Sequence, residues 1–292
     1  MSRPRVGFVG TGKVGTALGA GIQAAGYPVV AGWSRSTPAL TRFLSRVPGA
    51  AAASRPLDVV EAADLVFLTV PDSLIPVLAA SLSWDSTKIA VHCSGALSLD
   101  VLEPATAEGA AVGSLHPLLA LASAEADFRG ATAALEGDER ALPVLEQIAA
   151  DLELRALVLA PGQKALYHAA AVILSNYSVI LFAVAQEILE SLGEGEEEAR
   201  ASLLPLLRAV VTNLGRQSAP AALTGPIARG DVQTVAGHLA ALAAKHPELI
   251  PLYQELGLKT VDLANRQGSI DEDIATELRQ LLMAKQIEEV PV

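Results

Sequence analysis

Side chains that can donate or accept a proton gather at a few places in the sequence. His92, Ser94 and His116 follow apolar runs, and Lys164 and His168 open a long apolar stretch. Burial can tune the proton affinity of lysine and histidine, which suits them to protonating a substrate as its neighbouring carbon is reduced. Each group also has a structural use: the histidines as hydrogen-bonded core residues, Ser94 as a helix cap, Lys164 as a surface charge.

The apolar stretch carries its polar residues at helical spacing. On a helix, positions 164, 168, 172, 175 and 176 share one face. A polar stripe on an apolar helix needs partners, so it forms either a site or an internal network. We expect Lys164 or His168 to supply a proton and Asn176 to orient a substrate, with His92 and His116 facing the same crevice.

A second group of polar residues lies in a loop further along the chain. The loop runs from Leu223 to Asp231 as L-T-G-P-I-A-R-G-D. We expect Thr224 and Arg229, together with Ser94, to bind substrate, because a guanidinium can hold a carboxylate. Asp231 would then cap the next helix. The alternative is a local ion pair between Arg229 and Asp231 that shapes the turn.

A glycine-rich turn near the amino terminus indicates which cosubstrate such chemistry uses. Its sequence is Gly10-Thr11-Gly12-Lys13-Val14-Gly15, directly after the apolar run Val6-Gly7-Phe8-Val9 and before a helical pattern. In this context the first glycine allows the turn, the second lets the backbone approach a pyrophosphate, and the third lets helix pack on strand. The helix start then offers free N–H groups to phosphates. The sequence therefore predicts a dinucleotide site.

The end of the second predicted strand distinguishes between dinucleotides. An NAD site usually carries a carboxylate about 20 residues after the turn, whereas here the strand ends in Ser34-Arg35-Ser36. A guanidinium and two hydroxyls suit a 2′-phosphate, and Lys13 adds charge, so we expect NADP. The alternatives are that Arg35 is a solvated loop residue, and that a deazaflavin replaces the nicotinamide.

The elements that position these groups follow from the pattern of apolar runs. The first part alternates short strands with helices, which predicts an α/β fold with a doubly wound parallel (Rossmann) sheet. Val70, Pro71 and Asp72 then leave the fourth strand beside the cofactor. From Pro161-Gly162 onward the pattern is helical, which gives a dinucleotide-binding domain over 1–160 and an all-helical substrate and dimerisation domain over 161–292. Predicted strands are 5–9, 28–33, 49–53, 65–70, 88–92, 111–114, 131–136 and 155–159; predicted helices include 13–25, 37–46, 73–82 and 138–151.

Composition excludes several classes of protein. The formal net charge of −11 argues against a nucleic-acid partner, and the single cysteine, Cys93, allows no intrachain disulfide. His92, Cys93 and His116 lack metal-ligand spacing, so we expect no metal. The start of the chain runs into the first strand without room for a signal peptide, and we expect a cytoplasmic protein. The uncharged segment 165–185 is long enough to span a bilayer but lacks interfacial anchors, which favours a helix buried in a core or dimer interface.

These blocks together resemble one family. The glycine turn, the H-C-S-G-A and H-P motifs at 92–96 and 116–117, the Lys164/His168/Asn176 helix and the T-G-P-I-A-R-G-D loop are similar to Rossmann-like proteins with a helical C-terminal domain of unknown function, described as NADP-dependent oxidoreductases. Their layout is similar to pyrroline-5-carboxylate reductase, β-hydroxyacid dehydrogenases, ketopantoate reductase and prephenate dehydrogenase. The resemblance implies hydride transfer and a helical domain that packs against its twin in a homodimer. Enzymes of the β-hydroxyacid and ketopantoate groups pair a lysine with an asparagine one turn later, where this chain has His168.

Two functions from different classes follow. The first is an NADPH-dependent oxidoreductase that reduces a small oxo- or imino-acid, with ketopantoate as an example by analogy. The second is a non-catalytic NADP-binding sensor or scaffold. The proton-capable groups expected at the crevice favour the enzyme.

Overall fold

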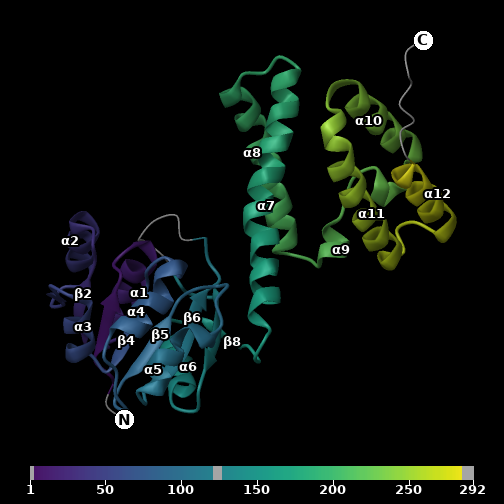
Figure 1. Cartoon of the computed structure of the whole chain (residues 1–292). Helices are drawn as coiled ribbons and strands as arrows, with labels where there is room; N and C mark the ends of the chain where they lie inside the picture. Colours follow the sequence, from purple (N-terminus) through teal and green to yellow (C-terminus); the bar gives the residue numbers. More distant parts are fainter. Residues whose placement is uncertain (1–2, 121–126, 285–292) are drawn as a thin grey trace. The chain divides into compact units, whose positions relative to one another are not determined.

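The chain forms two compact units whose boundary falls inside one long helix. The computed structural model describes residues 3–120 and 127–284, and its units comprise residues up to 178 and from 179 onward (Figure 1). The boundary lies within α7 (Lys164–Ser191), so the first part of this helix belongs to the first unit. The compact first unit thus extends past the Pro161-Gly162 break to Ser178.

The first unit is built on an eight-stranded sheet in the order β3-β2-β1-β4-β5-β6-β7-β8. Neighbouring strands are parallel except for β6 and β7, which are antiparallel. The expected parallel sheet is therefore corrected at this pair, because only parallel neighbours require a crossover connection and β6 and β7 run in opposite directions. The strands are β1 (Val6–Val9), β2 (Val29–Trp33), β3 (Ala51–Ala52), β4 (Leu65–Leu68), β5 (Ile89–His92), β6 (Ala111–Pro117), β7 (Thr132–Gly137) and β8 (Arg155–Val158).

Helices cover both faces of this sheet, as the apolar character of its strands requires. One apolar cluster joins Phe8, Phe67 and Leu115 to α1 and α6, and the other joins Val9 and Leu68 to the helices after β3, β4 and β5. Two short helices, α3 and α5, lie between predicted strands, where helices were expected without stated bounds. The helices are α1 (Lys13–Ala24), α2 (Thr37–Arg46), α3 (Pro56–Ala62), α4 (Ile75–Ser81), α5 (Glu103–Ala107) and α6 (Ala141–Asp151).

The register of the strands places one row of side chains across the second of these faces. Val9 pairs with Leu68, Leu68 with His92, His92 with Ser114, and Ser114 with Glu136. Paired residues of adjacent strands point to the same face of a sheet. The row is apolar over β1 and β4 and becomes polar over β5, β6 and β7. This change marks the part of the sheet where the site lies.

The second unit is helical and has its own core. Val235, Val261 and Leu278 are fully buried in a cluster formed mainly by its last three helices. Asp231 and Asp271 cap helices by accepting hydrogen bonds from backbone N–H groups, so the expected cap by Asp231 is confirmed. The helices are α8 (Glu196–Leu214), α9 (Ala219–Ala222), α10 (Val232–Lys245), α11 (Ile250–Gln267) and α12 (Glu272–Met283), with a short 3₁₀ turn η3 (Ile227–Arg229).

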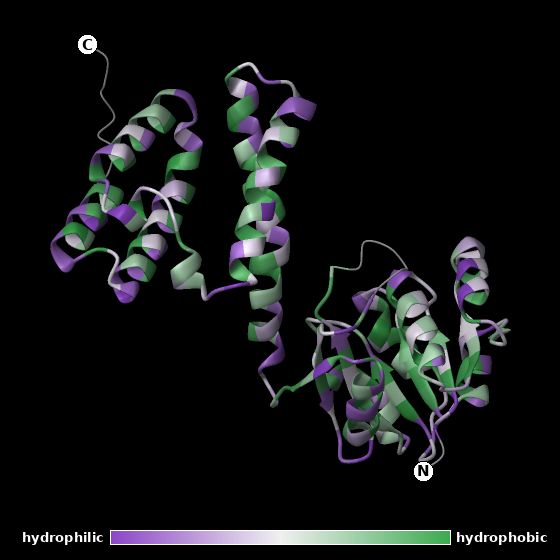
Figure 2. Ribbon diagram, turned by 180° about the vertical axis from the view of Figure 1, so that it is seen from behind, coloured by the Kyte–Doolittle hydropathy of each residue, from purple (hydrophilic) through white to green (hydrophobic). Residues whose placement is uncertain are grey.

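The helix α7 is apolar but is not a core helix of this chain. Its length and composition would allow it to cross a membrane, and none of its most apolar window is buried inside the chain. Leu166, Leu174 and Val179 are among its large side chains that are more than two-thirds exposed. Figure 2 shows hydrophobic and hydrophilic residues interspersed along this helix and the adjacent α8. The expectation of a helix buried in a core is therefore wrong for the single chain.

Candidate functional site

The glycine turn after β1 has the geometry that its spacing predicts. Gly10 has φ +103°, and a Cβ there would lie 2.5 Å from the carbonyl oxygen of Thr69. A Cβ on Gly15 would lie 2.3 Å from the carbonyl oxygen of Gly10, so the first turn of α1 packs closely on the turn. By contrast, a Cβ on Gly12 would meet nothing within 4 Å. The fold requires the first and third glycines, whereas the second leaves open space.

That open space adjoins an unsatisfied helix start. Gly12 is the N-cap of α1 and provides no side-chain cap, and Lys13 and Val14 begin the helix. Thr11 is fully buried, and its hydroxyl has no hydrogen-bond partner among residues 3–120 and 127–284. Free N–H groups and an orphaned hydroxyl next to empty space are what a bound phosphate would satisfy. The turn therefore fits a dinucleotide pyrophosphate.

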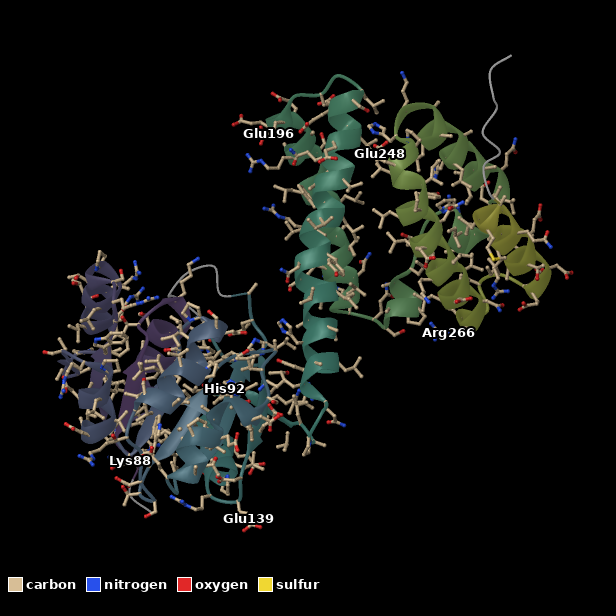
Figure 3. All side chains as sticks on the ribbon, viewed as in Figure 1. Lys88, His92, Glu139, Glu196, Glu248 and Arg266 are labelled. Carbon is tan, nitrogen blue, oxygen red and sulfur yellow. The ribbon has the colours of Figure 1, made fainter. Side chains whose placement is uncertain are left out.

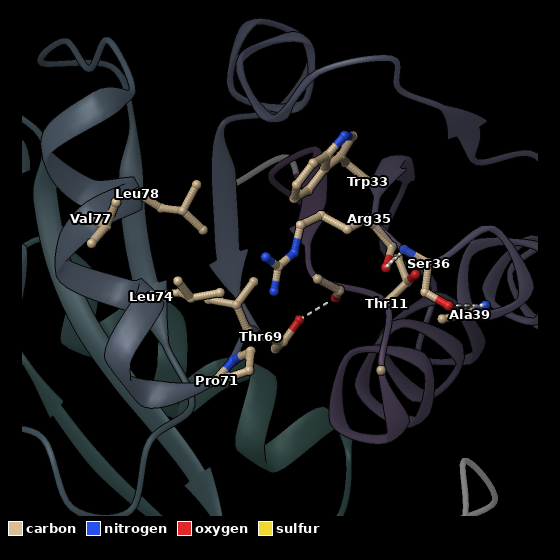
Figure 4. A pocket seen from close by; sticks show the side chains of 14 residues that line it. Thr11, Trp33, Arg35, Ser36, Ala39, Thr69, Pro71, Leu74, Val77 and Leu78 are labelled. Atoms are coloured by element: carbon tan, nitrogen blue, oxygen red, sulfur yellow. Dashed lines mark hydrogen bonds between the residues drawn. The ribbon is translucent and has the colours of Figure 1, made fainter.

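A cavity of about 400 Å³ extends from this turn over the ends of β2 and β4. The expected residues Ser34, Arg35, Val70 and Pro71 line it, together with Trp33. Figure 4 shows the guanidinium of Arg35 directed into this cavity, between Trp33 and Thr69. In the described part of the chain Arg35 has no ion-pair partner. A free cation at the end of β2 fits an anionic group at this end of the ligand.

The two serines beside Arg35 have local structural roles. The Ser36 hydroxyl accepts a hydrogen bond from the backbone N–H of Ala39 and caps α2. Ser34 Oγ accepts from the backbone N–H of Ser36. Ser36 therefore caps α2, and both serines also line the cavity.

A buried ion pair occupies the polar part of the strand row. Lys164 Nζ lies 2.6 Å from Glu136 Oε2, with side chains 3% and 7% exposed. Lys164 also donates a hydrogen bond to Ser114 Oγ, which lies 3.2 Å from the same carboxylate oxygen. Each charge is therefore paired and hydrogen-bonded, which is the condition for burying it without a large loss of stability. The first residue of α7 is thereby fixed against β6 and β7.

The charge of Lys164 acts on two histidines at the ends of β5 and β6. Burial, with this ammonium nearby, lowers the pKa of His92 to about 3. Burial and the same charge lower the pKa of His116 to about 4. Both imidazoles are neutral at pH 7. Neutral histidines can donate from one ring nitrogen and accept at the other.

The neutral His92 is held by the loop that follows it. Its Nδ1 accepts a hydrogen bond from the backbone N–H of Ser94, which puts the ring proton on Nε2. That nitrogen is buried and has no partner in the described part of the chain. Lys88 directly precedes β5 and His92 ends it, and Figure 3 labels both residues.

Two further side chains of α7 meet His116. The hydroxyl of Tyr167 lies 2.8 Å from His116 Nδ1, and burial raises the pKa of Tyr167 to about 12. The rings of His116 and His168 are 6.2 Å apart, edge to face. A Cβ on Gly95 would lie 2.7 Å from His168 Nδ1 and 2.9 Å from His116 Nε2. Both imidazoles thus lie directly over the backbone of the loop after β5.

The loop after β5 is hydrogen-bonded to the segment that follows β4. Ser94 donates a hydrogen bond of 2.7 Å to Asp72, and its hydroxyl accepts from the backbone N–H groups of Ala96 and Leu97. Ser94 therefore caps the loop as well as facing the strand ends. Asp72 directly follows Pro71, which lines the Arg35 cavity, and Ser94 directly precedes Gly95, over which the two imidazoles lie.

A second cavity, of about 410 Å³, adjoins the histidines. His116, Tyr167, His168 and Asn176 line it. Ser175 donates to the Asn176 side-chain oxygen or to the carbonyl oxygen of Ala171. The cavity lies wholly within the first unit. The predicted stripe on α7 is therefore divided: Lys164 is buried against the sheet, and the residues after it face the cavity.

The remaining predicted residues belong to the second unit. Thr224 lines a separate cavity with His238, whose Nδ1 lies 2.8 Å from the Tyr253 hydroxyl. Arg229 ends η3, and no ion pair joins it to Asp231 in the described residues. Sequence reasoning assigned no role to Glu136, although a carboxylate in an otherwise apolar strand was a signal that it needed a buried partner.

Two domain models match the sequence, and they agree with this geometry. Residues 1–117 match a Rossmann-like domain, and residues 131–260 match a domain of unknown function, DUF2520. The chain joins a Rossmann-like domain to a DUF2520 domain. None of the curated proteins is similar enough in sequence to count as a match.

Several solved structures share the fold. A protein from Thermotoga maritima is 28% identical with a TM-score of 0.74, covering 90% of this chain and 99% of that one. The 1-pyrroline-5-carboxylate reductase of Streptococcus pyogenes is 16% identical with a TM-score of 0.60, covering 95% and 99%. A reductive aminase from Aspergillus terreus in complex with NADPH and ethyl-5-oxohexanoate is 18% identical with a TM-score of 0.60, covering 96% and 93%. The similarity spans nearly the whole length of each protein.

Proposed function

We propose that the protein is an NADPH-dependent reductase of a small oxo- or imino-acid. The observation that carries the proposal is the glycine turn, where free space, an uncapped helix start and the orphaned Thr11 hydroxyl lie beside one another. These features leave donors unsatisfied in the protein alone and satisfied by a diphosphate. Two structural neighbours, a pyrroline-5-carboxylate reductase and a reductive aminase, belong to the same reaction class.

The residues of the first cavity would hold the cofactor. The backbone around Gly12 would bind the pyrophosphate, and Arg35 would bind a 2′-phosphate through charge-assisted hydrogen bonds. Ligands of open α/β sheets lie beyond the carboxyl ends of the strands, so the far end of the dinucleotide would approach Asp72 and Ser94. NADPH supplies a hydride when bound. The preference for NADPH over a deazaflavin rests on Arg35, since only the former has a 2′-phosphate.

The chain's own residues would bind the substrate and supply the proton. His116, Tyr167 and His168 line a cavity beside Gly95, and Asn176 would orient the substrate there. Tyr167 carries an O–H that its raised pKa keeps protonated, and His116 holds that hydroxyl in place. We therefore favour Tyr167 or His168 as the proton donor.

Lys164 has a different role in this proposal. Its ammonium is buried and bonded to Glu136 and Ser114, so it does not reach either cavity. Burial keeps His92 and His116 neutral, and the nearby charge of Lys164 adds to this effect. The ion pair of Lys164 fixes the start of α7. Lys164 thus positions the cavity wall and reinforces the neutral state that burial imposes on the histidines.

We further propose a homodimer formed through the helical part of the chain. Within the second unit, exposed apolar side chains recur on α7 and α8, among them Ile180, Leu206 and Val211. Large exposed apolar side chains that recur along two helices are typical of a site of association. Sedimentation of the purified chain tests the dimer directly.

The cofactor proposal is tested by calorimetric titration of the full chain with NADPH and NADH. We expect tight NADPH binding, and we expect Arg35→Gln to weaken it about 10- to 100-fold while leaving NADH binding unchanged. Arg200→Gln removes the same charge from an exposed position on α8 and serves as the control. Absence of binding by either nucleotide overturns the proposal. Binding without NADPH oxidation by any oxo- or imino-acid indicates a sensor instead.

A further inference from the structure

The second cavity contains an arginine for which neither the fold nor the cofactor provides a partner. Arg155 begins β8 and lines this cavity with Thr132 and Leu157. In the described part of the chain its guanidinium makes no hydrogen bond or ion pair. What distinguishes Arg155 from other unpaired arginines is that it lines a cavity together with His116, Tyr167 and His168. Arg35 is the corresponding free cation of the first cavity.

Strand register fixes where Arg155 lies relative to the histidines. His116 pairs with Ala134, and Ala134 pairs with Leu157, so these three side chains point to one face. Arg155 pairs with Thr132 and lies two residues before Leu157, on the same face. At about 3.3 Å per residue, its Cα is about 6.6 Å farther along the strand. The imidazole and the guanidinium thus occupy successive positions along one cavity wall.

The rest of the cavity wall is mostly apolar. Leu118, Val172 and Leu174 contribute to it, and Asn176 adds an amide. A cavity with apolar walls, a free guanidinium and a group of proton carriers selects a ligand with three matching parts. These are an anionic end, a hydrocarbon body and a polar group that can accept a proton.

The geometry points to Arg155 as the residue that binds the substrate carboxylate, in the cavity between α7 and β6–β8. The assignment rests on the proposed reductase function and specifies its substrate as an acid whose oxo or imine carbon lies beside His116 and Tyr167. A planar guanidinium binds a carboxylate through two parallel hydrogen bonds, which also fixes the direction in which the substrate lies. Arg155 thus takes the role that the sequence pattern suggested for Arg229.

The test measures binding and turnover separately. Pyruvate and levulinate are titrated into the full chain saturated with NADP⁺, each beside its ethyl ester, which lacks the charge. The same four compounds are then assayed for NADPH oxidation. The variants are Arg155→Gln, Arg155→Lys and the control Arg200→Gln, which removes an exposed charge from α8. Arg155 starts an edge strand with its side chain exposed, so the substitutions leave the fold intact.

We expect at least one acid to bind and its ester not to bind. Arg155→Gln should weaken binding of the acid about 10- to 100-fold, the range of a charged hydrogen-bonded pair, and Arg155→Lys should restore part of it. Equal binding by wild type and Arg155→Gln, or no binding of either acid by the wild type, overturns the assignment. Arg155-dependent binding without NADPH oxidation supports this site and refutes the reductase. If the rate of NADPH oxidation is the same with acid and ester and the same in wild type and Arg155→Gln, the reductase is supported and this site is refuted.

Discussion

The buried pair of Lys164 and Glu136 can be broken from either side, and the two results should differ in a defined way. Glu136→Leu leaves the ammonium with only Ser114 Oγ as a partner, and Lys164→Met leaves the carboxylate with the same hydroxyl. Both side chains are more than nine-tenths buried, so water cannot replace the missing charge. Loss of one partner of such a pair typically destabilises a protein by about 3–5 kcal/mol.

Proton transfer to or from solvent limits each penalty. An ordinary lysine side chain titrates at about pH 10.4 and a glutamate at about pH 4.3. At 1.36 kcal/mol per pH unit, removing the proton from an unpaired lysine at pH 7 therefore costs about 4.6 kcal/mol. Adding a proton to an unpaired glutamate at pH 7 costs about 3.7 kcal/mol. We expect Glu136→Leu to lower the free energy of unfolding by up to the first value and Lys164→Met by up to the second.

The pH dependence of the two variants has opposite signs. In Glu136→Leu the native state holds one proton fewer than the unfolded state, so stability rises with pH. In Lys164→Met the native state holds one proton more, so stability falls as pH rises. Urea unfolding followed by circular dichroism at pH 6 and pH 8 measures both effects against the wild type. The double variant should recover much of the loss, because two neutral side chains replace the pair.

A surface pair provides the matched control. Arg129 and Asp127 form an ion pair whose side chains are 69% and 62% exposed, and Arg129→Met should leave the free energy of unfolding nearly unchanged because solvent screens the pair. If the single variants at 136 and 164 behave like this control, or share one pH trend, the pair is not buried as described. The double variant also tests chemistry: NADPH oxidation that survives in it shows that Lys164 is not the proton donor.

Other perturbations give equally direct tests. Gly12→Ala should keep the wild-type melting temperature but weaken NADPH binding at least about 10-fold, whereas Gly15→Ala should destabilise the fold by about 1–3 kcal/mol, since its Cβ meets the Gly10 carbonyl. Gly95→Ala should lower kcat/KM more than it lowers stability, because its Cβ displaces two imidazoles; unchanged kinetics would show that the loop is not at the site. The free energy of unfolding should fall as pH drops from about 6.5 towards 4, by up to about 1.4 kcal/mol per pH unit for each of His92 and His116. Over this range the imidazoles bind protons in the unfolded state but stay neutral in the native state. His92→Gln should reduce that slope in urea titrations.

Local features of the sequence were sufficient to predict the sheet and the cofactor turn. A strand such as Leu65–Leu68 is buried on both faces and therefore reads as a continuous apolar run. The glycines act through backbone geometry over a few residues, so their spacing alone predicts the close approaches at Gly10 and Gly15. Short helices such as α3 and α5 lack enough turns to show a periodic pattern, so their bounds could not be predicted.

Features that depend on strand pairing could not be predicted from the sequence. The antiparallel pairing of β6 with β7 is a contact between segments joined by a long connection, and nothing in either segment specifies its direction. That pairing sets Glu136 opposite Ser114 and places Arg155 beyond His116. Sequence reasoning consequently treated Glu136 and Arg155 as ordinary residues, although one neutralises a buried ammonium and the other faces a cavity.

The stripe on α7 shows why helical spacing predicts a face but not a role. Lys164 and His168 are one turn apart and share a side of the helix, so they looked like equal candidates for the same task. One turn is also about 5.4 Å of rise, enough to pass from the closed surface of the sheet to an open cavity beside it. Lys164 lies against the sheet, where its charge needs Glu136 as a partner. His168 lies one turn later beside the cavity, where its imidazole can contact a ligand. The position of a residue along α7 relative to the sheet, which the local sequence does not specify, thus separates Lys164, whose charge is paired inside the protein, from the residues that can contact substrate.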